Sequence, residues 1–186
     1  MKLSDKLEVA KAFSAMMHAD AGKMYGTHPY SHHLQKVVDV LLAFDITDRD
    51  ILAAGYLHDI LEDTQVTHEM LIEIFGPATA SYVYAVTDEP GENRKDRKAK
   101  TYPKIRVSPV AIQLKLADRI ANVKFSMATK NERMFRMYKK EQPEFTRQLR
   151  AAVEDTPPVQ NEMWEHLDFL ISTGLEFINS YNPANE

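Results

Sequence analysis

Apolar residues recur at spacings of three and four along most of this chain, which is the pattern of helices that bury one face. The clearest apolar stripes occupy residues 3–17, 34–42 and 51–61, and only 6 glycines interrupt the chain. The stretch that most resembles a strand, residues 82–86, is short and isolated, so we assign it to a helix. The pattern therefore predicts an all-α fold.

Small polar residues and prolines mark the expected helix ends. Ser108 and Pro109 form an N-cap and a first-turn proline, which open a helix that runs to about Met127. Thr67 opens a short helix that ends at Gly76. Further helices are expected after Thr47-Asp48, at residues 78–86, after Pro143 and from Pro157-Pro158 to about residue 180. Residues 22–29 and 88–106 look irregular, and the second of these segments is expected to be either a partly mobile helix or a loop.

The chain has 186 residues and a mass of 21.3 kDa, which favours one compact domain. It contains no cysteine, which excludes disulfides, thiolate nucleophiles and zinc–thiolate sites, so any metal must be held by His, Asp, Glu or Asn. No apolar run reaches the roughly 20 residues that span a bilayer. The amino terminus alternates charged and apolar residues, unlike a signal peptide. We expect a soluble, cytoplasmic protein that does not bind a membrane.

The net charge of −4 is unevenly distributed. Residues 1–91 contain 6 basic and 14 acidic residues, residues 92–150 contain 17 and 6, and residues 151–186 contain 7 acidic residues and no Lys or Arg. A basic middle third in an acidic protein indicates a bound anionic ligand, although a lysine-rich solvated helix face gives the same pattern. The pI of about 6.0 disfavours nucleic acid as a partner.

One imidazole and three carboxylates fall within six residues near the end of the third apolar stripe: His58, Asp59, Glu62 and Asp63. The carboxylates repel one another unless a cation is present. Neutral imidazole with carboxylate oxygens is the ligand mixture of a divalent first-row metal. The neighbouring leucines and isoleucine indicate burial, but an exposed polar helix end remains the alternative for this segment.

Asp118 interrupts an apolar stretch of the long helix after residue 108, and Asn122 follows one turn later on the same face. A buried aspartate is rare without a partner. That partner is either a ligand or an intrahelical cation, Lys115 or Arg119. The paired histidines at residues 32 and 33 are by themselves more typical of a surface or a satisfied core than of a metal site.

The order of these clusters, a histidine, then His-Asp, then a later aspartate, resembles the HD-domain metal-dependent phosphohydrolases, an all-α superfamily. The extended motifs resemble the hydrolase domain of the RelA/SpoT family and its free-standing members, the small alarmone hydrolases. The resemblance covers residues 17–125 and implies a single domain, with an HD-domain helical bundle at about residues 1–130 and a C-terminal helical extension at about residues 131–186. The matching residues are His58-Asp59-Ile60-Leu61-Glu62-Asp63-Thr64, Lys115-Leu116-Ala117-Asp118-Arg119-Ile120-Ala121-Asn122, residues 26–33 and Phe75-Gly76.

The resemblance implies a role for each matching polar residue. The family's first metal ligand follows a Pro-Tyr-x-x-His pattern, which selects His33. Glu62 and Asp63 match an acidic pair that positions or deprotonates the attacking water, with Glu62 as the general base. Asn122 matches a residue that holds this water or the substrate, and Lys23 lies near a basic residue that meets the nucleoside. The implied ligands of one divalent metal ion, Mn²⁺ in this family, are His33, His58, Asp59 and Asp118.

The implied reaction is the attack of a metal-activated water on phosphorus, which removes the 3′-diphosphate from guanosine tetraphosphate or pentaphosphate. The expected partner is therefore a small phosphorylated nucleotide. The reaction needs no side-chain nucleophile, in agreement with a chain that lacks cysteine. We expect the remaining parts of the nucleotide to contact Arg94, Lys95, Arg97, Lys98, Tyr102, Lys104 and Arg119.

Two alternative functions remain. The first is an HD hydrolase for another nucleotide or phosphate ester, such as a nucleoside monophosphate, because Met24, Leu34 and Phe125 depart from the alarmone hydrolase pattern at positions that affect guanine recognition and not the metal. The second is a non-catalytic nucleotide-binding module, which the complete ligand set and Glu62 disfavour. The apolar face of the last helix is expected to cover the core, with a homodimer as the second interpretation.

Overall fold

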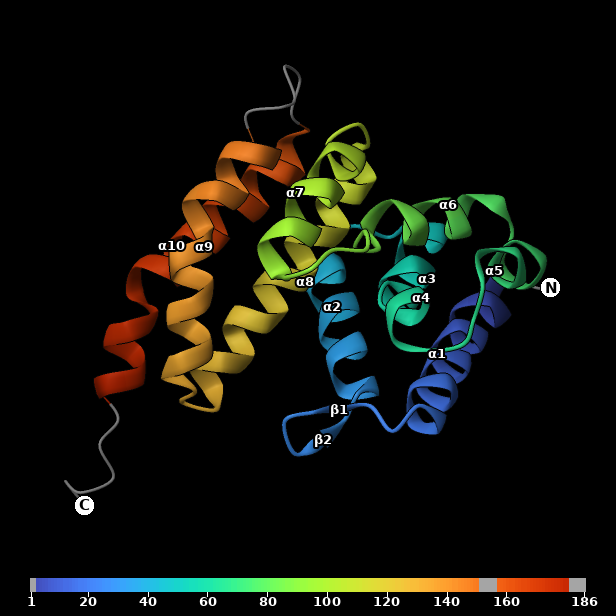
Figure 1. Cartoon of the computed structure of the whole chain (residues 1–186), viewed down its shortest axis with the longest axis horizontal. Coiled ribbons are helices and arrows are strands. Elements are labelled where there is room, and N and C mark those ends of the chain that lie inside the picture. The colour runs from blue at the N-terminus through green and yellow to red at the C-terminus, as the bar shows by residue number, and fades with distance from the viewer. Residues whose placement is uncertain (1–2, 151–156, 181–186) are drawn as a thin grey trace.

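The computed structural model describes residues 3–150 and 157–180 of the chain. Apart from one antiparallel hairpin of two short strands, its described elements are helices (Figure 1), which confirms the predicted all-α fold. No helix within these ranges is long and apolar enough to cross a membrane. The elements are α1 (Leu3–Asp20), β1 (Met24–Tyr25), β2 (His28–Pro29), α2 (Ser31–Ala43), α3 (Arg49–Leu57), α4 (Ile60–Asp63), α5 (His68–Phe75), α6 (Pro77–Val86), α7 (Arg94–Ile105), α8 (Pro109–Ala128), α9 (Glu132–Leu149) and α10 (Pro158–Ser180).

Several helices begin where the sequence predicts. The Asp48 carboxylate accepts a hydrogen bond from the backbone N–H of Ile51 and so caps α3. The Ser108 hydroxyl accepts the backbone N–H of Ala111 at the start of α8. The strand-like residues 82–86 lie inside α6, as predicted.

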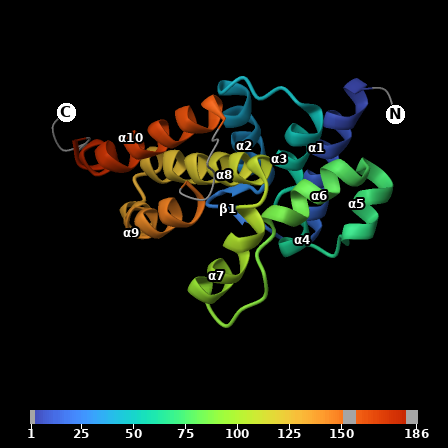
Figure 2. The same ribbon diagram turned by 90° about the horizontal axis from the view of Figure 1, so that it is seen from above.

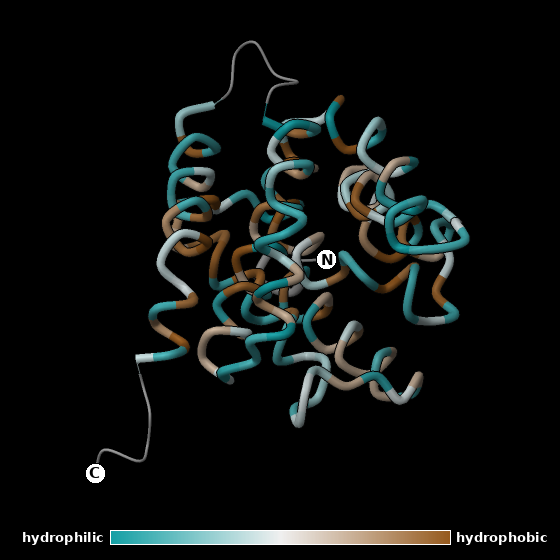
Figure 3. Tube along the Cα trace, turned by 60° about the vertical axis from the view of Figure 1, so that its left-hand side comes forward, coloured by the Kyte–Doolittle hydropathy of each residue, from teal (hydrophilic) through white to brown (hydrophobic). Residues whose placement is uncertain are grey.

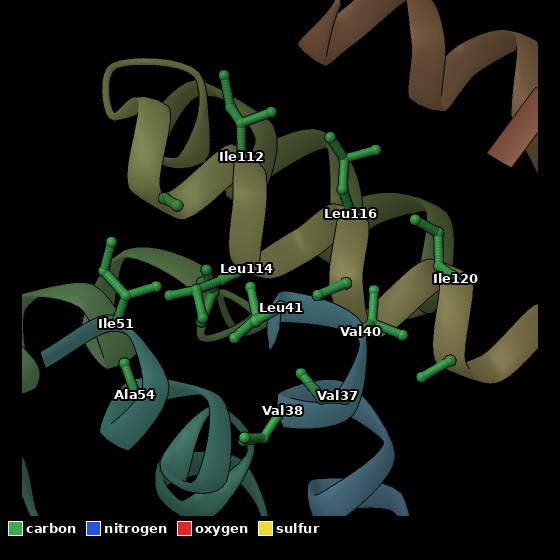
Figure 4. Close-up of a cluster of buried hydrophobic side chains, with 14 of the residues drawn as sticks. Val37, Val38, Val40, Leu41, Ile51, Ala54, Ile112, Leu114, Leu116 and Ile120 are labelled. Atoms are coloured by element: carbon green, nitrogen blue, oxygen red, sulfur yellow. The ribbon is translucent and has the colours of Figure 1, made fainter. Parts of the chain in front are cut away.

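Helices α2 and α8 lie at the centre of the molecule, with α9 and α10 on one side and α1 and α3 to α6 on the other (Figure 1 and Figure 2). Hydrophobic segments gather where helices face one another, and hydrophilic segments occupy the outer turns (Figure 3). The main core forms where α2, α3 and α8 meet (Figure 4). It includes Val37, Val38, Val40, Leu41, Ile51, Ala54, Ile112, Leu114, Leu116 and Ile120.

The expected helix start at Pro143 is wrong. Pro143 lies inside α9, which begins at Glu132 after its cap Asn131. A proline inside a helix costs a backbone hydrogen bond. The buried face of α9 nevertheless continues on both sides of the proline, with Phe135 before it and Phe145 after it, so packing keeps the helix continuous.

Residues 88–106, which the sequence leaves open between a helix and a loop, contain the helix α7. The Asn93 side chain caps this helix by accepting a backbone N–H. The many charges obscure a short buried face made of Thr101, Tyr102 and Ile105. These three side chains attach a highly charged helix to the rest of the molecule.

Candidate active site

The His-Asp pair lies at a break between two helices. The apolar stripe predicts one helix over residues 51–61, but α3 ends at Leu57 and α4 begins at Ile60. The buried His58 ring donates its Nδ1–H to the carbonyl oxygen of Gly55 over 2.9 Å. That hydrogen bond leaves the lone pair on Nε2, which is the form of imidazole that binds a metal.

Three parts of the chain bring the implied metal ligands together. His33 from α2 and Asp118 from α8 have Nε2 and Oδ1 3.4 Å apart. The Nε2 atoms of His33 and His58 are 3.2 Å apart, and the donor atoms of His33, His58 and Asp118 all lie within 4.8 Å of one another. Asp59 Oδ2 lies 2.9 Å from His58 Nε2 and 3.6 Å from His33 Nε2. We call these four residues the His-Asp cluster.

The charge of the His-Asp cluster fits a bound cation. Burial by itself lowers the pKa of His33, but hydrogen bonds to Asp118 and Asp59 raise it to about 9. Burial raises the pKa of Asp118, yet the nearby Lys115 and the two imidazoles hold this pKa well below its usual range. The buried carboxylates therefore attract positive charge, and imidazole nitrogen with carboxylate oxygen suits Mn²⁺, Fe²⁺, Co²⁺ or Zn²⁺.

Uncharged donors hold the two carboxylates of the cluster. The Tyr30 hydroxyl donates to Asp59 Oδ2 over 2.5 Å, and Asn122 Nδ2 donates to Asp118 Oδ1 over 2.5 Å. The Tyr25 hydroxyl in β1 donates in turn to Asn122 Oδ1 over 2.9 Å. Such outer hydrogen bonds orient carboxylates toward a metal.

A polar cavity of about 220 Å³ adjoins the His-Asp cluster. Its wall contains three residues of the cluster and four cationic side chains, so it offers both a metal-binding group and an anion-binding group. The lining residues are Tyr30, His33, Asp59, Glu62, Asp88, Arg94, Lys98, Lys115, Asp118, Arg119, Asn122, Tyr138 and Phe145.

The family model described as HD domain matches residues 10–145, which is most of the chain. This chain belongs to the HD domain family. An HD domain implies a divalent metal, and in this HD domain His33, His58 and Asp118 are able to hold one.

Two curated proteins that are similar to this HD domain are both called guanosine-3′,5′-bis(diphosphate) 3′-pyrophosphohydrolase. A curated protein of Drosophila melanogaster, guanosine-3′,5′-bis(diphosphate) 3′-pyrophosphohydrolase MESH1, is 34% identical over 98 residues, which is 52% of this chain and 55% of that protein. A protein of Aquifex aeolicus called guanosine-3′,5′-bis(diphosphate) 3′-pyrophosphohydrolase is 33% identical over 125 residues, 65% of this chain and 18% of that protein. The chain thus spans about half of the first relative and under a fifth of the second.

A solved structure shares the fold of this HD domain. It is described as a metazoan ortholog of SpoT that hydrolyses ppGpp and plays a role in starvation responses. The TM-score is 0.72, and the match covers 90% of this chain and 94% of the solved chain at 23% identity. This likeness agrees with the helical bundle predicted from the sequence.

The cavity of the HD domain includes only some of the predicted substrate contacts. Arg94, Lys98 and Arg119 line it. The Lys104 ammonium lies 2.5 Å from a carboxylate oxygen of Glu89 instead. The predicted contacts that the described cavity wall does not include are Lys95, Arg97, Tyr102 and Lys104, of which Tyr102 is buried in the core.

Lys23 and Asp63, predicted to act on the nucleoside and on the water, pair with each other at 2.6 Å. This ion pair joins the turn after α1 to the end of α4, and neither residue belongs to the described cavity wall. Their roles in the reaction stay predictions.

Glu62, by contrast, does line the cavity. Its Oε1 accepts the backbone N–H of Asp88 over 2.7 Å. Burial, followed by the charge of Asp59, raises the pKa of Glu62 above its usual range. A carboxylate with a raised pKa holds a proton more tightly, which suits a proton acceptor that works near neutral pH.

The polar residues of the site for which the sequence predicts no role in binding or reaction include Tyr25, Tyr30, Asp88, Lys115 and Tyr138. Lys115 is predicted only as an ion-pair partner of Asp118, whereas its ammonium both lies 3.5 Å from Asp118 Oδ2 and lines the cavity. Tyr30 had a signal, because it belongs to the Pro-Tyr-x-x-His pattern. Tyr25 had none, because its partner is 97 residues away in the sequence.

Proposed function

We propose that this HD domain is a metal-dependent phosphohydrolase that removes the 3′-diphosphate from guanosine 3′,5′-bis(diphosphate) and related alarmones. The main support is the cavity, in which the His-Asp cluster adjoins the cations Arg94, Lys98 and Arg119. Such a wall suits a substrate with several phosphate groups. The names of the curated relatives support the same substrate.

The proposed cofactor is one divalent cation, Mn²⁺. When bound, such a cation lowers the pKa of its water and offsets charge on phosphoryl oxygens. Tyr30 and Asn122 keep the carboxylates in place. The proposed ligands are His33, His58, Asp59 and Asp118.

In the proposed reaction, a water oxygen forms a bond to the phosphorus attached to the 3′ oxygen, and the bond between that phosphorus and the 3′ oxygen breaks. The products are inorganic pyrophosphate and guanosine 5′-diphosphate. Glu62 accepts the water proton on a carboxylate oxygen and returns it to the 3′ oxygen, since its raised pKa allows both transfers. Arg94, Lys98 and Arg119 hold the phosphate oxygens.

Another phosphorylated nucleotide is the second candidate substrate, because an aromatic side chain occupies a position where the resemblance has a small hydroxyl residue. The Phe125 ring lies 4.0 Å from the Tyr25 ring, measured between centroids. It also packs against the hairpin, where a Cβ on Gly26 would lie 3.1 Å from Phe125 Cζ. This packing changes the surface that a base would meet and leaves the metal ligands intact.

Product analysis distinguishes these substrates. Purified chain with Mn²⁺ is incubated with guanosine tetraphosphate and with nucleoside mono-, di- and triphosphates, each with and without EDTA. Release of pyrophosphate from the 3′ position, lost with EDTA, is expected. Release of inorganic phosphate from monophosphates alone would keep the HD chemistry and reject the alarmone as substrate.

The substitution Glu62→Gln tests the proton acceptor. We expect kcat to fall about 10²- to 10⁴-fold because the amide cannot accept the proton, while the metal content measured by elemental analysis stays unchanged. Glu73→Gln, at an exposed glutamate on α5, is the matched control and should keep full activity. Full turnover by Glu62→Gln would assign the proton transfer to another group.

We further propose a cytoplasmic location, because the proposed substrate is an intracellular nucleotide. We also propose a homodimer, supported by the exposed rings of Phe169 and Phe177 on α10, which are 62% and 57% accessible. Light scattering of the purified chain measures the oligomeric state directly.

A further inference from the structure

Two arginines of the cavity wall share one carboxylate. Glu141 on α9 accepts hydrogen bonds from Arg94 Nε at 2.7 Å and from Arg94 Nη2 at 3.1 Å, one to each carboxylate oxygen. Glu141 Oε2 also accepts from Arg119 Nη1 at 3.1 Å. Three different helices, α7, α8 and α9, therefore meet at this carboxylate.

The environment of Arg119 explains why an anion is needed there. Its side chain is only 5% exposed, and its guanidinium carbon lies 4.5 Å from the centre of the Phe145 ring and 5.0 Å from that of Tyr138. A buried guanidinium requires a paired anion. Burial raises the pKa of Glu141, but the hydrogen bonds and charges of Arg94 and Arg119 lower this pKa by more than burial raises it. Glu141 is therefore ionised and supplies this anion.

A phosphate group of a substrate would bind the same donors. Arg94 and Arg119 both line the cavity. Glu141 occupies the Nε and Nη2 edge of Arg94, which is one of the two-donor edges that guanidinium offers to carboxylate and phosphate alike. A phosphate that reaches this edge must therefore take the place of the Glu141 carboxylate.

We propose that Glu141 is a specificity-determining residue, whose carboxylate occupies the anion site of Arg94 and Arg119 until a phosphate group that is not attacked displaces it. A substrate with a single phosphate, once that phosphate lies at the His-Asp cluster, has no second group to compete with Glu141. The two arginines therefore favour nucleotides with further phosphates, and Glu141 limits the size of that preference, because a further phosphate must first displace its carboxylate. The identity of the nucleotide rests on the proposed function, whereas the anion site does not.

Binding of inorganic pyrophosphate tests the anion site without turnover. Isothermal titration calorimetry is run on the metal-loaded full chain and on Glu141→Gln. We expect about tenfold tighter binding to Glu141→Gln, because the neutral amide competes less for the two arginines. Unchanged or weaker binding to this variant would overturn the proposal.

Two further variants test whether the gain in pyrophosphate affinity arises at the Arg94–Glu141 pair. Glu144→Gln changes an exposed glutamate on the same helix, which pairs with Arg147 and not with Arg94 or Arg119, so pyrophosphate binding should not change. Adding Arg94→Gln to Glu141→Gln should abolish the gain in affinity, because the donor edge is then lost. A gain that persists in this double variant would place the pyrophosphate elsewhere and overturn the proposal.

Thermal unfolding covers the case in which Glu141→Gln folds poorly. Without a partner anion for buried Arg119, this variant should melt below the unaltered chain, and pyrophosphate should raise its Tm more than it raises that of the unaltered chain. An equal rise in both proteins would count against displacement. Absence of turnover of guanosine tetraphosphate would reject the proposed function and leave these binding results standing.

Discussion

The two carboxylates of the His-Asp cluster each accept a hydrogen bond from a neighbouring side chain in a largely buried site. Asp59 and Asp118 are separated in the sequence by the helices α4 to α7 and part of α8, yet each accepts a short hydrogen bond from an uncharged donor. In a buried place, water does not replace a lost hydrogen bond, so each donor has a measurable effect. Tyr30 shows the effect of burial on a hydrogen bond, and Lys98 shows its effect on a pKa.

Removing the Tyr30 hydroxyl should weaken metal binding. Tyr30→Phe deletes the donor that lies 2.5 Å from Asp59 Oδ2, and loss of such an outer hydrogen bond lowers metal affinity about 10- to 100-fold. Calorimetric titration with Mn²⁺ measures this. Tyr56→Phe, which removes a hydrogen bond to Gln35, is the control and should bind Mn²⁺ as the unaltered chain does. Equal affinities in all three proteins would show that Asp59 does not need Tyr30.

The pH dependence of kcat/KM should follow the titration of the Lys98 ammonium. Burial, followed by the charge of Lys115, lowers the pKa of Lys98 to about 8; Arg94 acts in the same direction, and Asp88 and Asp118 act against it. Only the ammonium form attracts phosphate, so kcat/KM for a polyphosphate substrate should fall as the pH rises through about 8. Lys98→Arg stays charged at these pH values and should remove this fall. An unchanged profile in that variant would point to a different titrating group.

At the level of elements, the site forms where the break between α3 and α4 meets α2 and α8. The break between α3 and α4 turns His58 and Asp59 toward α2 and α8. The β1–β2 hairpin reaches α8 through Tyr25. On the other side of α8, α9 supplies the residues that surround Arg119, so the helical extension takes part in the cavity wall.

The contact between α9 and α10 should not tolerate a methyl group at Gly174. A Cβ there would overlap the ring of Phe135, which is fully buried. Gly174→Ala should lower the free energy of unfolding by about 1–3 kcal/mol, even though alanine adds about 1 kcal/mol of helix propensity. Urea denaturation followed by circular dichroism measures the change. Ser172→Ala on the exposed side of α10 is the control and should stay within about 0.5 kcal/mol.

For the whole molecule, the His-Asp cluster joins the two sides of the helical bundle at one point. A cation bound there would link α2, the α3–α4 break and α8, and would bind the folded chain only. Removing the metal with EDTA should therefore lower Tm, and Mn²⁺ at 100 times its Kd should restore about 2.7 kcal/mol of stability. Scanning calorimetry with EDTA and then with added Mn²⁺ tests this. A Tm that does not respond would argue against a metal at the cluster.

Local sequence was enough to predict the helical class and several helix caps, and the resemblance to a known family supplied the four residues of the His-Asp cluster. Periodicity and caps depend on residues three or four positions apart, and the ligand motifs are short, so both leave a pattern in the sequence itself. Local rules failed at residues 58–59 and at Pro143, where packing against the core outweighed propensity, and they left α7 open between a helix and a loop.

Only the tertiary structure shows which side chains meet in and around the cavity wall. Tyr25 meets Asn122 across 97 residues, and Arg94 meets Glu141 across 47. Neither pair leaves a periodic or adjacent signal, because only the packing of separate helices brings the two side chains together. The motif thus predicts the metal ligands, whereas the packing of α7, α8 and α9 places the cationic side chains of the cavity wall beside them.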